Sequence, residues 1–130
     1  MIIPSKYRDE IGKQKLVVTR GLDENLVVYT QEGFEKSAEA LMEQLSSGKA
    51  DGRKLRRYFA TNAENCELDK QGRILLSAKL RAHAKLDRDV VISGNLENFE
   101  IWNPERWEEV SDFGDGGDIA EQFESLDIRF

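Results

Sequence analysis

The sequence predicts a single α+β domain rich in strands, and two observations carry this prediction. The chain contains an internal repeat whose copies each read as two short strands, and a helical segment connects the copies. The length of 130 residues is that of one domain, and 39% apolar residues suit a globular protein. We expect two small β units joined by a helical arm and followed by an acidic tail.

The repeat becomes visible when the chain is aligned with itself at an offset of 73 residues. No gap is needed over 34 aligned pairs, of which eight are identical, more than two unrelated segments would share. The identical pairs are Lys6/Lys79, Arg8/Arg81, Val17/Val90, Val18/Val91, Gly21/Gly94, Glu24/Glu97, Asn25/Asn98 and Glu32/Glu105. We therefore assign residues 1–34 and 63–110 to two related units, residues 35–62 to a helical connector and residues 111–130 to an acidic tail.

Each copy predicts the same order of elements. A short apolar run leads into a turn of helix, at 4–11 and 77–84, and two strands follow with a glycine bend between them. The strands, rich in β-branched and aromatic residues, are expected at 16–19, 25–30, 89–93 and 98–103. Pro4 and Ser77 suit the starts of the helical turns. Thr30 and Asn103 are N-cap residues for a further helix after each strand pair.

Helical periodicity marks the connector and the tail. The apolar positions of the connector fit one face of a helix: Phe34, Ala38, Leu41, Met42 and Leu45. After the break "SSGKADG", the basic segment "RKLRRYF" at 53–59 resumes a helix, in which Tyr58 and Phe59 are expected to anchor in the core. Ile119, Phe123 and Leu126 predict a short amphipathic helix in the tail.

Several classes of function are disfavoured by the composition. No apolar run approaches the ~20 residues that span a membrane, and the first ten residues turn charged too early for a signal peptide. Cys66 is the single cysteine, so no internal disulfide is possible and a reducing cytoplasm is expected. With one histidine, His83, there is no zinc-ligand spacing. Because no acid–base pair or cofactor motif is evident either, we expect a non-enzymatic protein without cofactor or small-molecule substrate.

Negative charge is concentrated near the C-terminal end of the sequence. The net charge is -6, but residues 105–130 alone contain nine acidic and two basic side chains. Residues 49–81 carry nine basic and four acidic side chains. Charges further apart than about 8–10 Å are largely screened at physiological salt. The acidic total therefore does not exclude a polyanionic partner such as nucleic acid.

The segment "DKQGR", residues 69–73, predicts a hairpin turn. Aspartate at the first position and glycine at the fourth are typical of a type I turn. Asp69 would accept hydrogen bonds from main-chain amides two residues on, and Gly72 would take an unusual φ. Because such tetrapeptides are common, the simplest interpretation is a turn alone.

In a second interpretation, the same turn is a rigid support that presents basic side chains to a partner. Stiffness lowers the entropy that Lys70 and Arg73 lose when they engage a partner. Arg73 would read the O6 and N7 atoms of guanine. Phosphate contacts would come from Lys70, Lys79 and Arg81. The segment 53–59 is open to both interpretations, as a solvated basic helix face or as another DNA surface.

These features resemble the MraZ family of bacterial transcriptional regulators, which are related to the AbrB DNA-binding domains. The resemblance rests on "ELDKQGRILLSAKLR", on "IIPSKYRDEI" and on the strand-pair segments "TRGLDENLVVYT" and "ENFEIWNPERW". It implies a duplicated AbrB-like swapped-hairpin β-barrel with connecting helices, which assembles into a closed homo-oligomeric ring. It also implies binding to repeated double-stranded promoter sites and repression of the division and cell-wall gene cluster, in the cytoplasm at the nucleoid. The expected DNA-binding residues are Asp69, Lys70, Arg73, Lys79, Arg81, Lys6 and Arg8.

The turn motif has no counterpart in the first copy. At the repeat offset its twin would fall just before Met1. A start codon assigned too far downstream, a trimmed N-terminus and a lost motif would each explain this, and we favour a misplaced or trimmed start.

A second hypothesis is an antitoxin-like AbrB module. In such a protein a small β fold dimerises and an acidic tail binds a basic protein partner. The negative tail motivates this hypothesis, whereas the presence of two copies of the unit favours the regulator.

Overall fold

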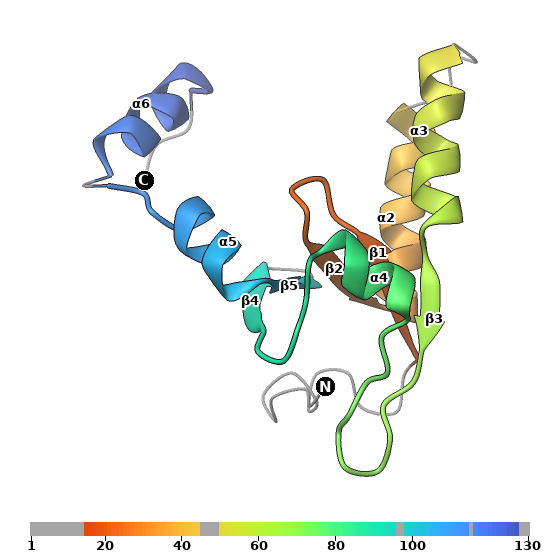
Figure 1. The fold of residues 1–130 in the computed structure, drawn as a ribbon. Coiled ribbons are helices and arrows are strands. Elements are labelled where there is room, and N and C mark those ends of the chain that lie inside the picture. Colours follow the sequence, from red (N-terminus) through yellow and green to blue (C-terminus); the bar gives the residue numbers. More distant parts are fainter. Residues whose placement is uncertain (1–14, 45–49, 96–97, 115, 128–130) are drawn as a thin grey trace.

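The architecture is α+β, as expected from the sequence (Figure 1). The structure, a computed structural model, describes residues 15–44, 50–95, 98–114 and 116–127. Its strands are β1 (Leu16–Arg20), β2 (Leu26–Thr30), β3 (Glu64–Cys66), β4 (Val91–Asn95) and β5 (Asn98–Trp102). Its helices are α2 (Gln31–Gln44), α3 (Ala50–Thr61), α4 (Ala78–His83), α5 (Pro104–Val110) and α6 (Gly117–Ser125). The helical turn expected at 4–11 lies outside the described residues.

The equivalent hairpins of the two copies, β1–β2 and β4–β5, meet at the pairing of β2 with β5. The strands form one antiparallel sheet in the order β3-β1-β2-β5-β4. Leu26 pairs with Ile101, and Val28 pairs with Phe99. The repeat equates Leu26 with Phe99 and Val28 with Ile101, so this pairing maps onto itself when the copies are exchanged. An approximate two-fold axis therefore passes through the pair between them, Val27 and Glu100.

The second copy departs from the gapless alignment by one residue. In the first copy Val18 pairs with Val28, which predicts a pair between Val91 and Ile101. The structure pairs Ile92 with Ile101 instead. A slip of one residue exchanges the faces of a strand. Val90 and Ile92, not Val91, consequently pack against the core.

The sheet is open, so the prediction of a closed barrel is wrong for the described residues. Strands β3 and β4 form its two edges and do not pair with each other. Strand β3 pairs with β1 over three residues, and the chain then leaves the sheet to form the hairpin at 68–74 and helix α4. The swapped-hairpin arrangement of an AbrB-like fold remains a prediction.

One face of the sheet carries the main hydrophobic core. Alternate residues of the strands point to this face, and the largest of them are fully buried. Leu80 of helix α4 and Ala84, the residue after the helix, cover them and are 0% and 1% exposed. Complete burial of a leucine side chain contributes about 1.5–3 kcal/mol to folding. The core residues are Leu16, Val18, Leu26, Val28, Ile74, Leu76, Leu80, Ala84, Phe99 and Ile101.

The opposite face is organised by aromatic pairs that recur in both copies. Tyr29 contacts Phe34 edge-to-face with ring centroids 6.0 Å apart, and the equivalent Trp102 and Trp107 lie 5.8 Å apart. Phe34 also stacks on Phe59 at 5.0 Å, which holds α3 beside α2 (Figure 1). Phe59 thus anchors α3 to α2, but it is only half-buried and lies outside the core, so the prediction of Phe59 as a core anchor is wrong in part. Tyr58 is 38% exposed, so the same prediction for Tyr58 is wrong, because it lies on the outer side of α3.

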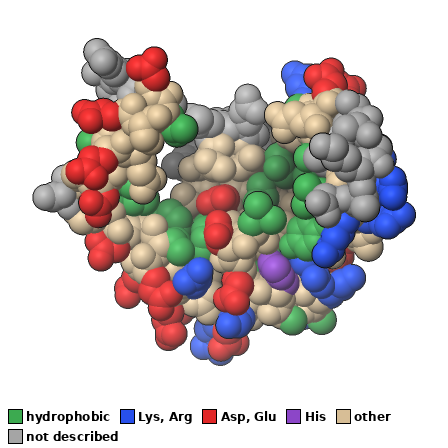
Figure 2. Space-filling model, turned by 90° about the horizontal axis from the view of Figure 1, so that it is seen from above, with side chains coloured by type: hydrophobic (Ala, Val, Ile, Leu, Met, Phe, Trp, Pro, Cys, Tyr) green, Lys and Arg blue, Asp and Glu red, His purple; other side chains and the backbone are tan. Residues whose placement is uncertain are grey.

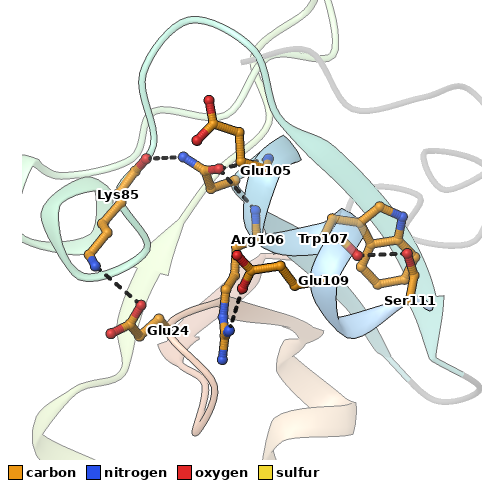
Figure 3. Close-up of polar contacts among 8 residues, drawn as sticks. Glu24, Lys85, Glu105, Arg106, Trp107, Glu109 and Ser111 are labelled. Atoms are coloured by element: carbon orange, nitrogen blue, oxygen red, sulfur yellow. Dashed lines mark hydrogen bonds and ion pairs between the residues drawn. The ribbon is translucent and has the colours of Figure 1, made fainter. Parts of the chain in front are cut away.

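The predicted helix caps are present, and the Asn103 cap also contacts the end of α4. Thr30 Oγ1 accepts a hydrogen bond from the Gly33 N–H, and Asn103 Oδ1 accepts one from the Glu105 N–H. The Asn103 side chain also donates to the Lys85 carbonyl at 2.8 Å (Figure 3). The Lys85 ammonium pairs with Glu24 at 3.4 Å, an exposed contact of about 0–1 kcal/mol. The end of α4 is thus attached both to the β1–β2 turn and to the start of α5.

Substitution of Gly21 by alanine should destabilise the fold. A Cβ atom at this position would lie 2.6 Å from Cγ of Asn25, whose side chain is buried in the same turn. The Gly21 N–H also donates to the Asn25 carbonyl at 2.7 Å, so the turn has little room to adjust. We expect a loss of about 1–3 kcal/mol in the free energy of unfolding, measured by urea denaturation.

Leu22→Ala is the matched control, because Leu22 is next in the same turn and is 90% exposed. Its free energy of unfolding should stay within about 0.5 kcal/mol of the parent value. Equal stability of Gly21→Ala and the parent would contradict the close packing described for this turn.

Candidate nucleic-acid interface

The segment 69–73 forms the predicted hairpin turn. The Asp69 N–H donates to the Arg73 carbonyl at 2.9 Å, and the Gly72 N–H donates to the Asp69 carbonyl at 3.1 Å. One carboxylate oxygen of Asp69 accepts hydrogen bonds from the N–H groups of Gln71 and Arg73, each at 2.8 Å. Gly72 has a φ of 78°, a conformation that glycine adopts without a steric cost. These bonds give the turn a defined shape independent of any partner.

The turn stands at the end of an arm that projects from the body of the molecule (Figure 1). A bridge between Leu68 and Ile74 joins the two sides of the arm. Strand β3, which pairs with β1, ends at Cys66 before the arm begins. Ile74 and Leu76 are buried in the core and fix the arm to the sheet. The tip is therefore exposed while its base is anchored.

The electrostatic state of Asp69 follows from its place in the turn. The hydrogen bond from the Arg73 backbone N–H lowers the pKa of its carboxyl below the ordinary value of 3.8. Desolvation acts in the opposite direction and raises the pKa, whereas the Gln71 N–H and the charge of Arg73 lower it further. The carboxylate is thus charged at neutral pH, and it accepts hydrogen bonds from backbone N–H groups of the turn. Asp69 orients the turn, whereas Lys70 and Arg73 are exposed for contact.

Helix α4 carries the next predicted contacts. Ser77 caps it by accepting a hydrogen bond from the Leu80 N–H at 3.2 Å, as the sequence indicated. Leu80 faces the core, and Lys79 and Arg81 are exposed. Arg81 borders a hollow of about 190 Å³ together with Ile74 and Leu75. The fold therefore brings Arg81 to the base of the arm, although no described contact joins Lys79 to the turn.

Arg88 belongs to this basic region, although the sequence did not indicate it. It is exposed and lines the same hollow as Arg81, next to Leu75, which is 88% exposed. Nothing in the local pattern "LDRD" distinguishes Arg88, because its proximity to Arg81 arises only when α4 turns back toward β4. Lys6 and Arg8 lie outside the described residues, so their place relative to the arm stays a prediction.

The basic helix α3 belongs to a different region of the surface. Lys54 and Arg57 are exposed on it, and α3 rises on the side of the sheet away from the arm (Figure 1). The two basic segments of the sequence are thus separated in space. They do not form one continuous surface.

Comparison with known proteins decides the family. A family model described as "MraZ protein, putative antitoxin-like" matches twice, over residues 1–58 and 59–115. The chain belongs to the MraZ family. "Transcriptional regulator MraZ" of Thermoanaerobacter sp. (strain X514) is 45% identical over 98% of this chain and 90% of its own length. The protein of the same name from Lachnoclostridium phytofermentans is 43% identical over 100% of this chain and 89% of its own length. These names support a role in transcriptional regulation for this MraZ protein.

The side chains of Cys66 and His83 have surroundings that do not indicate a reactive site. Burial raises the pKa of the Cys66 thiol, and the charge of Glu64 raises it further, so the thiol is not an activated nucleophile. Nε2 of His83 lies 3.2 Å from the Gly21 carbonyl, so the half-buried imidazole contacts the β1–β2 turn. Within the described ranges no cluster of three metal-ligating side chains occurs. Of the helices described, none is long and apolar enough to span a membrane.

The turn should lose its Asp69 hydrogen bonds on acidification. Because the pKa of Asp69 is lowered by folding, its contribution is present above the ordinary value of 3.8 and is lost as the pH falls through the lower folded pKa. An NMR titration should place the midpoint of the Asp69 carboxyl below 3.8. The amide shifts of Gln71 and Arg73 should follow that carboxyl.

Glu67→Gln provides the control, since it removes a neighbouring exposed carboxyl and leaves the turn intact. The Gln71 and Arg73 amides should titrate in this variant as in the parent. A midpoint for Asp69 at or above 3.8 would contradict the hydrogen-bonded turn described here.

Proposed function

We propose that this protein is a sequence-specific DNA-binding transcriptional regulator that contacts promoter DNA through the 69–73 turn and helix α4. As the family resemblance implies, it acts as a repressor of the division and cell-wall gene cluster, at the nucleoid in the cytoplasm. The names of its relatives support the regulatory role. The observation that carries the proposal is the pre-shaped turn, in which Asp69 bonds two amides and leaves Lys70 and Arg73 exposed.

The two basic residues of the turn have different roles in this proposal. Arg73 inserts its guanidinium into the major groove, where the planar fork matches O6 and N7 of guanine. Lys70 is a flexible point charge and contacts a phosphate, which positions the protein without reading sequence. The hydrogen-bonded turn lowers the entropy lost when both side chains bind.

Helix α4 extends the phosphate contacts toward the base of the arm. Lys79 and Arg81 lie on its exposed side, and Arg88 borders the same hollow as Arg81. Each phosphate contact releases counterions from DNA and makes affinity depend on salt. Lys6 and Arg8 supply the corresponding contacts from the first copy in this proposal.

Assembly multiplies the effect of each arm. Several copies in a closed ring, with AbrB-like swapped hairpins, would engage repeated promoter sites together. Once one arm is bound, the others meet their sites at a high effective concentration. Modest affinity per copy then gives tight and specific binding overall.

Arg73→Ala and Lys70→Ala should weaken DNA binding in different ways. Loss of Arg73 should cost about 1–3 kcal/mol per engaged copy on the specific site and flatten the preference among bases. Loss of Lys70 should weaken all sequences alike and reduce the slope of log K against log salt by about one unit per engaged copy. Both effects can be measured by fluorescence anisotropy with the protein's own promoter and a scrambled duplex.

Lys36→Ala is the control for removal of a surface charge, since Lys36 lies on α2 in an exposed ion pair with Glu32. It should leave both affinity and base preference unchanged. Circular dichroism establishes that each variant is folded. The proposal fails if Arg73→Ala binds the promoter as tightly and as selectively as the parent protein.

A further inference from the structure

We propose that helix α6 of one copy docks on helix α3 of a second copy of this chain. This inference rests on the assembly proposed above and names the surfaces that would build it. Figure 2 shows acidic side chains gathered on the part of the molecule that contains α5 and α6, and basic side chains on the opposite side, over α3. The two surfaces are complementary in charge and belong to opposite ends of one molecule.

Helix α6 presents a row of acidic side chains. Asp118, Glu121 and Glu124 are spaced by three residues and are all exposed. Within the described part of the chain, no ion pair neutralises them. Like charges at this spacing lie on neighbouring turns and destabilise a helix. A basic partner would remove this repulsion.

Helix α3 presents the opposite pattern. Lys54 and Arg57 are three residues apart and exposed, and Arg56 lies beside them. In the described residues, neither Lys54 nor Arg57 forms an ion pair, and the Arg56 guanidinium reaches only the sulfur of Met42, at 3.8 Å. The nine residues of α6 span about 14 Å and the twelve of α3 about 18 Å, so the acidic row fits along the basic one.

Apolar side chains accompany both charged rows. Leu55 on α3 is 52% exposed, and Tyr58 is 38% exposed. Beside α6, Phe113 and Leu126 are 61% and 69% exposed. Helix-on-helix contact would remove this apolar surface from water, at about 25 cal/mol per Å² buried. Charge then sets the orientation, and apolar burial adds affinity.

The arrangement of the helices makes this contact intermolecular. In Figure 1, α6 extends on one side of the sheet and the α2–α3 pair rises on the other, with the strands between them. Because α6 and α3 are different surfaces, each copy would use α6 toward one neighbour and α3 toward the next. Head-to-tail contacts of this kind close into a ring when the rotation between copies allows it.

Two charge-reversed variants test the contact. The first, Lys54→Glu with Arg57→Glu, carries negative charge on both helices. The second, Glu121→Lys with Glu124→Lys, carries positive charge on both. Each variant alone should sediment at low salt as a single copy of 14.9 kDa, whereas the parent forms larger assemblies. An equimolar mixture should recover the assembly, because α6 of each variant then complements α3 of the other.

The mixture distinguishes the possible occupants of α3. If α6 instead folded onto α3 of its own chain, mixing would not restore assembly, and only all four changes in one chain would restore the contact. That result, or parental mass for either variant alone, would overturn the inference. So would a parent protein that sediments as a single copy. The variant Asp23→Lys with Asp89→Lys alters the charge as much as the second variant, at exposed sites on other elements, and should assemble normally.

Failure of this contact and failure of the proposed function give different results. Arg73→Ala should retain parental mass in sedimentation, since the arm is separate from α3 and α6. A protein that assembles through these helices but ignores its promoter would refute the DNA-binding proposal alone. A protein that binds its promoter with assembly unaffected by either charge reversal would refute the helix contact alone.

Discussion

Pairing of β2 with β5 is the contact on which the rest of the structure depends. The first copy contributes the hairpin β1–β2 and the second the hairpin β4–β5, and an isolated two-stranded hairpin is marginally stable in water. The central pairing joins the hairpins into a sheet and places Leu26, Val28, Phe99 and Ile101 in one continuous apolar face. Since the pairing maps onto itself when the copies are exchanged, each copy contributes an equivalent strand to it.

The same sheet determines how the candidate DNA-binding arm is held. Helix α4 follows the arm in the chain and packs Leu80 and Ala84 on strands that include those of the first copy. His83 and Lys85, at its end, contact Gly21 and Glu24 of the β1–β2 turn. The arm, which belongs to the second copy, is therefore supported by contacts with the first copy. Loosening the sheet would therefore also loosen the support of the candidate DNA-binding turn.

Much of the fold could be predicted because its signals are local. Strand positions followed from β-branched and aromatic runs, and the caps at Thr30, Ser77 and Asn103 followed from side chains that accept hydrogen bonds within three residues. The turn at Asp69 belongs to the same class, as all its bonds lie within five residues. For the candidate site, the sequence indicated its basic residues but not which of them would be neighbours.

By itself, the sequence determined the fold class, the duplication, the caps and the shape of the 69–73 turn, because each depends on residues close together in the chain or on a pattern repeated along it. Only the tertiary structure decided the register of β4, the open sheet, the hollow shared by Arg81 and Arg88, and the separation of α3 from the arm. These features depend on contacts between distant segments. Packing between these segments decides which side chains are buried. In a strand, a register shift of one residue moves every side chain to the opposite face of the sheet.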